Sequence, residues 1–116
     1  MKSIIILEGA AYNQFPDLNA DDVGIKPEFV VRNNDDSLVD LTTGTVLLKM
    51  KQINTTTNKV SGTCTLDDPV LGECSYTTVA GDLDTAGVYD AELQVTIGSA
   101  INTIPLGRFK IDQDLP

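Results

Sequence analysis

The most regular alternation of apolar and polar residues along the chain covers residues 89–97. Odd-numbered positions in this stretch are apolar, beginning with Tyr89 and ending with Ile97, and even-numbered positions are polar or acidic. A period of two residues predicts a half-buried β-strand, because successive side chains of a strand point to opposite faces of the sheet. We expect the apolar side of this strand to face a core and the acidic side to face water.

Shorter apolar or alternating runs separated by turn residues predict further strands at 2–8, 25–32, 45–53, 59–66, 73–79 and 101–112. The last run changes phase around Pro105 and Gly107, which predicts a bulge or an edge break there. No long window shows the stripe of an amphipathic helix. The pattern therefore predicts an all-β chain, folded as an immunoglobulin-like antiparallel β-sandwich of about seven or eight strands.

Residues 9–23 form a long loop or arm in this reading, since they carry turn residues and exceed an ordinary connection. The segment is expected either to contain a short edge strand or to pack on a neighbouring subunit. Tyr12 and Phe15 are candidate subunit contacts; the alternative is that both rings cover the edge of the domain's own core. Residues 112–116 are expected to form an acidic tail.

The entrance to the strand at 89–97 carries Asp84, Gly87 and Tyr89. An acidic residue, small residues and then a tyrosine are typical of the corner of immunoglobulin-like sandwiches, where the tyrosine hydroxyl bonds to the backbone upstream. We predict a structural corner from these three residues; the alternative is an ordinary glycine turn. Asp82 and Asp84 also resemble the start of a calcium loop, but the bidentate glutamate of such a loop has no counterpart. A turn-capping role for Asp84 is therefore favoured.

Composition narrows the function classes. The 116 residues form one expected domain, 1–116, and their net charge of −9 disfavours nucleic acid and anionic membranes as partners. The apolar run near the N-terminus is too short for a signal peptide or a membrane span, so synthesis in the cytoplasm is expected. With two cysteines and no histidine, neither a zinc site nor a Ser-His-Asp triad is expected. We expect no cofactor, no bound metal and no enzymatic activity.

Cys64 and Cys74 are expected to face one another. Reflecting the predicted hairpin about Pro69 places them on neighbouring strands with both side chains inward. A cross-strand pair is somewhat wider than a disulfide usually requires, so both a disulfide and two buried free thiols stay open. A cytoplasmic origin favours the thiols.

Three segments carry a resemblance to a known family: Val39-Asp40-Leu41-Thr42 with Gly44-Thr45-Val46, the hairpin from Gly62 to Tyr76, and the block from Ala80 to Val95. From about Gly24 to its end, the chain resembles the N-terminal immunoglobulin-like domain of phage baseplate upper proteins. Members of that family usually continue into a long C-terminal part, whereas this sequence stops at Pro116. The resemblance implies a sandwich that attaches or supports other proteins, and residues 1–23 lie outside it.

The expected function is that of a non-enzymatic virion structural or assembly protein of a tailed bacteriophage, located in the baseplate, the neck or connector, or on the capsid surface. Its partners would be other virion proteins and further copies of itself in a symmetric ring or lattice, contacted through 9–23 and 101–116. The alternative is an immunoglobulin-like adhesion module, displayed on a particle, that contacts the host surface or carbohydrate. Such a module would need exposed aromatic residues, and the predicted loop tips at 33–37, 54–58 and 67–71 contain none.

Overall fold

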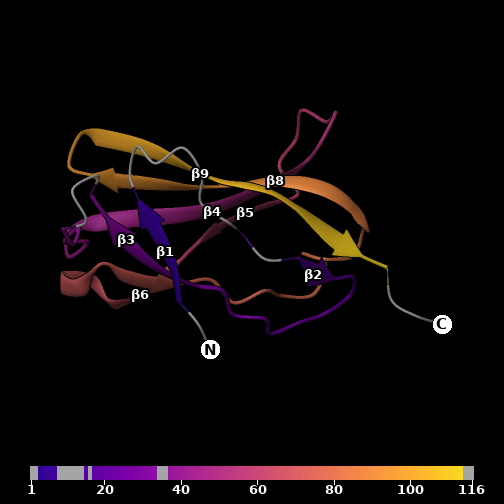
Figure 1. Cartoon of the computed structure of the whole chain (residues 1–116), viewed down its shortest axis with the longest axis horizontal. Coiled ribbons are helices and arrows are strands. Elements are labelled where there is room, and N and C mark those ends of the chain that lie inside the picture. Colours follow the sequence, from indigo (N-terminus) through magenta and orange to yellow (C-terminus); the bar gives the residue numbers. More distant parts are fainter. Residues whose placement is uncertain (1–2, 8–14, 16, 34–36, 114–116) are drawn as a thin grey trace.

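The computed structural model describes residues 3–7, 15, 17–33 and 37–113. Two β-sheets pack face to face, and the only helical element in these residues is the short 3-10 helix η1 (Pro69–Leu71) (Figure 1). The strands are β1 (Ser3–Leu7), β2 (Leu18–Asn19), β3 (Glu28–Arg32), β4 (Gly44–Gln52), β5 (Val60–Thr63), β6 (Thr65–Asp68), β7 (Glu73–Ser75), β8 (Gly87–Ile97) and β9 (Ala100–Asp112). No helix among the described residues is long and apolar enough to cross a membrane.

The strand order confirms the predicted sandwich. One sheet has the order β1-β3-β7-β6 and the other the order β2-β9-β8-β4-β5. These are the positions of strands A, B, E and D, and of A′, G, F, C and C′, in immunoglobulin-type sandwiches. Most neighbouring strands are antiparallel, as expected, but two edge pairs, β1 with β3 and β2 with β9, are parallel.

The predicted central strand is β8, which pairs with β4 on one side and with β9 on the other. The side chains of Tyr89, Ala91, Leu93 and Val95 are all buried, and the residues between them are only partly so. This confirms the direction of the alternation. The inner faces of β4, β8 and β9 are apolar at every second position and face the other sheet. The core therefore lies between the two sheets.

The predicted irregularity of the last strand is a bulge between β8 and β9. Ala91 lies opposite Gly107 and Glu92 opposite Pro105, so one extra residue of β9 is accommodated at Leu106. Gly107 has a positive φ of 85°, which suits a glycine at a bulge. The extra residue explains the change of phase, since both Leu106 and Phe109 can then face the core.

The predicted strand at 59–66 is two strands that belong to different sheets. β5 pairs with β4, β6 pairs with β7, and Cys64 lies between them, where the chain passes from one sheet to the other. An alternating pattern continues through the crossing, because inward-facing residues of both sheets meet the same core. Sequence periodicity therefore does not reveal where the strand changes partners.

The arm predicted at 9–23 contains a short edge strand, β2, which is one of the two arrangements expected for it. The backbone N–H of Phe15 donates to the carbonyl of Leu106 at 2.9 Å, and β2 then runs parallel to the end of β9. The Phe15 ring is fully buried and lies 4.7 Å, centroid to centroid, from Phe109. The domain's own core therefore covers this ring, which is the alternative that the sequence left open, and the ring is not exposed for a subunit contact. Tyr12 lies outside the described residues.

Candidate interaction surface

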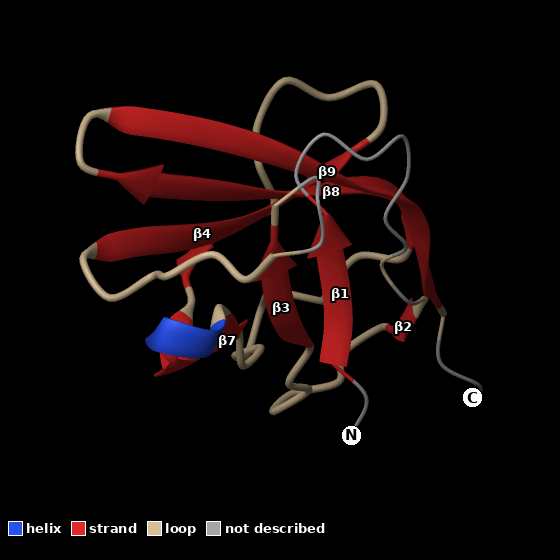
Figure 2. Ribbon diagram, turned by 60° about the vertical axis from the view of Figure 1, so that its left-hand side comes forward, coloured by secondary structure: helices blue, strands red, loops and turns tan. Residues whose placement is uncertain are grey.

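The two ends of the sandwich are built from different loops (Figure 2). At the first, which we call the hairpin end, the β8–β9 turn at 98–99 lies beside the turn at 42–44 and η1. Gly44 lies opposite Ile97, and the N–H of Leu41 donates to the carbonyl of Pro69. At the second, the corner end, the start of β8 lies beside the far end of β4, where Tyr89 is opposite Gln52.

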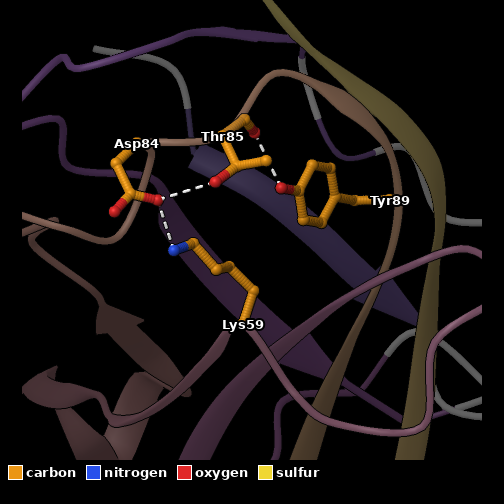
Figure 3. Close-up of polar contacts among 4 residues, drawn as sticks. All are labelled: Lys59, Asp84, Thr85 and Tyr89. Atoms are coloured by element: carbon orange, nitrogen blue, oxygen red, sulfur yellow. Dashed lines mark hydrogen bonds and ion pairs between the residues drawn. The ribbon is translucent and has the colours of Figure 1, made fainter.

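The predicted corner is present at the second end (Figure 3). The hydroxyl of Tyr89 donates to the backbone carbonyl of Thr85 at 2.7 Å, which ties the chain entering β8 to the strand itself. The ring below that hydroxyl is buried and stacks near Phe109 at 5.7 Å between centroids. Gly87, where β8 begins, packs closely on Gln52: a Cβ there would lie 2.7 Å from the Gln52 Nε2.

Asp84 has a second partner that the sequence pattern did not indicate. Its carboxylate accepts a hydrogen bond from the Thr85 hydroxyl at 2.9 Å and forms an ion pair with Lys59, which arrives from the start of the β5 segment (Figure 3). The bond from Lys59, followed by the bond from Thr85, holds the pKa of Asp84 below its usual value. The same bond raises the pKa of Lys59. The Asp84 carboxylate thus binds groups of its own domain.

A second tyrosine–aspartate contact lies at the same end. Tyr76 donates to the Asp82 carboxylate at 2.7 Å, and the N–H of Val79 donates to the same carboxylate oxygen at 3.0 Å. Burial, and then the bond to Asp82, raise the pKa of Tyr76 to about 12. The Tyr76 ring lies against Gly62, where a Cβ would be 2.2 Å from a ring carbon. Asp82 and Asp84, which resemble the start of a calcium loop in sequence, therefore both bind protein groups of this corner.

The cysteines are both free and buried. Cys74 lies opposite Phe29, and the hairpin pairs Thr65 with Ser75 and Asp68 with Glu73, so the predicted direct pairing of Cys64 with Cys74 is wrong. The two thiols still lie close together, and the hydrogen bond with Cys64, followed by burial, raises the pKa of Cys74. Both side chains belong to the core.

The hairpin end exposes apolar side chains. Val70 and Leu71 of η1 are 61% and 41% exposed, and Leu38, on the segment that leads to the 42–44 turn, is 41% exposed. On the neighbouring β9, Ile101 is 60% exposed. Gly72 holds η1 in place: its φ is +73°, and a Cβ would lie 2.6 Å from the Val31 carbonyl oxygen.

The half of the five-stranded sheet that is nearest the hairpin end lacks charged residues. No charged residue occurs between Glu92 and Arg108, between Asp40 and Lys49, or between Lys59 and Asp67. Across the outer face, Thr96 therefore lies between Thr45 and Ile101, and the row beside it is formed by Leu47, Gln94 and Thr103. For a chain of net charge −9, this is an unusually neutral surface.

The other half of this face carries charges of both signs. Lys49 lies opposite Glu92, Lys51 lies opposite Asp90, and Arg108 binds the Asp90 carboxylate at 2.9 and 3.3 Å. A hollow of about 260 Å³ lies among Lys49, Lys51, Asp90 and Glu92. Its lysines and carboxylates are adjacent and of opposite sign. This part of the surface is therefore suited to exposure to water or to contact with polar groups. Among the described residues no group of three or more His, Cys, Asp or Glu side chains is placed to hold a metal ion.

The class that the fold defines is an immunoglobulin-like β-sandwich. Comparison with solved structures finds a similar fold in the N-terminal domain of phage TP901-1 ORF48, with a TM-score of 0.62 and 11% sequence identity. The likeness covers 97% of this chain and 96% of that one. No family model matches the sequence. No curated protein matches it either.

Proposed function

We propose that this chain is a non-enzymatic structural component of a tailed-phage particle and acts through protein–protein contacts. The observation that carries the proposal is the likeness in fold to a phage protein domain over nearly the whole of both chains. The sequence resemblance to the immunoglobulin-like domain of baseplate upper proteins supports the same class. Baseplate, neck or connector, and capsid surface are the positions in the particle that the proposal includes.

The distribution of side chains supports a role in contacts. The titratable groups with shifted pKa at the corner end, Asp84, Lys59 and Tyr76, are held by partners within the fold. Of the exposed apolar side chains, Val70, Leu71 and Ile101 lie on or beside the hairpin end, whereas Val79 lies near the corner end. A neutral surface with exposed aliphatic residues suits association with another protein.

An adhesion module that contacts carbohydrate is the second candidate that the sequence suggested. Sugar-binding surfaces use exposed aromatic rings. In the described part of the chain the rings of Phe15, Phe29, Phe109 and Tyr89 are buried, and that of Tyr76 lies against Gly62. The arrangement of rings thus favours the structural role over the adhesive one.

The test is immunogold electron microscopy of particles purified from a lysate of the cells that express this gene, with an antibody raised against the purified chain. The proposal expects label at one locus of the particle, and that locus names the baseplate, neck or capsid. A tail-tube protein of the same particle serves as the positive control. Particles that carry the control protein but no label, from cells in which the chain is abundant, would overturn the proposal.

A further inference from the structure

Contacts between described residues cover the outer edge of β9 along only part of its length. On the side away from β8, β2 pairs with Ile111 and Asp112, and Phe15 donates to Leu106. Between these points the N–H of Lys110 donates to the Asp17 carboxylate at 2.8 Å. Ahead of the bulge, residues 100–103 are all exposed. Over that stretch β8 is the only strand of the described chain that pairs with β9.

Proteins usually protect such an edge with charge, with proline or with a bulge, because an open edge pairs with other strands. β9 has its proline and bulge at 105–107, in the middle of the strand, and its charges only beyond them. The stretch ahead, residues 100–104, carries neither a charge nor a proline, and Ile101, Thr103 and Ile104 are β-branched residues that favour strands. This open edge therefore lacks the charge and proline that usually protect an edge strand.

The main-chain direction on this edge can be inferred from Pro105. Proline has no N–H to donate, so in a sheet it is placed where its nitrogen faces away from the neighbouring strand. Because main-chain groups alternate between the two sides of an antiparallel strand, Ile101 and Thr103 also direct their N–H and C=O groups away from β8. A second strand could bind both residues.

We propose that residues 100–104 form a self-association strand, which pairs antiparallel with the same edge of a second copy of this chain. Charge identifies the occupant. Two copies with a net charge of −9 each repel one another through most of their surfaces, and the stretch between Glu92 and Arg108 is one that they can bring together without apposing like charges. A basic partner of another kind would gain most by binding the acidic surfaces instead.

Geometry supports a two-fold pairing centred on Asn102. Ile101 of one copy would then exchange main-chain hydrogen bonds with Thr103 of the other, and the two Asn102 residues would face one another as a non-hydrogen-bonded pair. Such an interface uses the same patch on both copies, as two-fold interfaces require. The short strand buries little area, so the isolated pair is weak in solution and is strengthened when other contacts of an assembly hold the copies together.

The first experiment measures self-association of the full chain by sedimentation equilibrium, with Ile101→Lys as the test variant and Val79→Lys as its matched control. Val79 is 56% exposed and Ile101 60%, so both variants place one new cation on the surface, one on the open edge and one near the corner end. The wild type is expected to dimerise reversibly at concentrations up to about 1 mM. Ile101→Lys should raise the dissociation constant at least about tenfold, whereas Val79→Lys should leave it within about twofold. A monomeric wild type, or equal effects of the two variants, would overturn the proposal.

The second experiment tests the register through Asn102→Cys, with diamide as the oxidant that accepts the two electrons and two protons. Opposite residues of a non-hydrogen-bonded pair have Cα atoms about 4.5 Å apart, within the range of a disulfide. Asn102→Cys should form a covalent dimer much faster than Val79→Cys, and the wild type, whose two cysteines are buried, gives the background. Equal rates for the two variants would exclude this register and the pairing with it.

The inference deepens the proposed function, because it names one contact of the proposed virion component, but the two can fail separately. A chain that is monomeric in solution, yet present on particles and lost from them in Ile101→Lys, would show that a different virion protein covers the edge; the second copy would then be wrong and the proposed function right. A chain that dimerises through β9 but is absent from particles would give the opposite result.

Discussion

The corner end and the hairpin end of this sandwich differ in how their polar side chains are partnered. At the corner end, charges and hydroxyls are paired with one another: Tyr89 with Thr85, Asp84 with Lys59, Tyr76 with Asp82. At the hairpin end, aliphatic side chains of Val70 and Leu71 are left in solvent. The difference indicates that side-chain contacts at the corner end contribute to the stability of the fold, while the exposed aliphatic side chains of the hairpin end can change without loss of the fold.

The largest expected difference between the two ends comes from Leu83→Ala and Leu71→Ala. Leu83 is 1% exposed and its carbonyl accepts the N–H of Asp21, so its truncation leaves a cavity under the corner. We expect a loss of about 2–5 kcal/mol in the free energy of unfolding for Leu83→Ala, and a change within about 0.5 kcal/mol for the exposed Leu71→Ala. Urea denaturation measures both, and similar losses would remove the distinction between the ends.

One residue of the hairpin end is expected to resist substitution. Gly72→Ala meets both a φ of +73° and a backbone carbonyl of Val31 at 2.6 Å. Gly98→Ala, in the β8–β9 turn, meets a φ of +61° and no atom within 4 Å. The left-handed conformation alone costs about 1–2 kcal/mol for a residue with a Cβ, so Gly98→Ala should lose about that much and Gly72→Ala distinctly more. Chemical denaturation of the two variants checks this order. An equal loss of unfolding free energy would mean that the chain around η1 moves to accommodate the new methyl group.

A smaller effect is expected from the corner hydrogen bond itself. Tyr89→Phe keeps the buried ring and removes only the hydroxyl that bonds the Thr85 carbonyl, so it should cost about 1 kcal/mol of unfolding free energy. Thr85→Ala keeps that carbonyl and removes a side chain whose hydroxyl bonds Asp84 at the surface. We expect Thr85→Ala to stay within about 0.5 kcal/mol of the wild type. A Tyr89→Phe variant as stable as the wild type would show that the corner bond does not hold the turn.

The smallest effect is expected from the ionisation of Tyr76 in alkaline solution. Tyr76 has a pKa raised to about 12 from 10.0. A raised pKa stabilises the fold fully below the unfolded pKa of about 10, and that contribution is lost as the pH rises through the folded pKa. Absorbance of tyrosinate should therefore show a group that ionises near pH 12, and Tyr76→Phe should remove it. Persistence of that ionisation in Tyr76→Phe would assign it to another tyrosine.

The all-β sandwich could be predicted from the sequence because its strongest signals are local. Alternation from Tyr89 onward follows from the two-residue period of a strand, and the corner joins residues four apart, Thr85 and Tyr89. The bulge could also be predicted, since Pro105 and Gly107 each disfavour a regular ladder of hydrogen bonds between β8 and β9. For these features the residues that cause the structure are neighbours along the chain.

Only the tertiary structure decided which partner each of the remaining groups has. Lys59 and Asp84 are 25 positions apart, and nothing in the sequence between them indicates their ion pair. Cys64 continues an alternating run, yet it marks the passage between sheets, because both sheets supply inward residues to one core. Phe15 shows the same limit: an apolar ring in an arm predicts burial, but whether its own domain or another subunit covers it depends on where the arm lies. Here the arm follows the edge of β9, and the chain covers the ring itself.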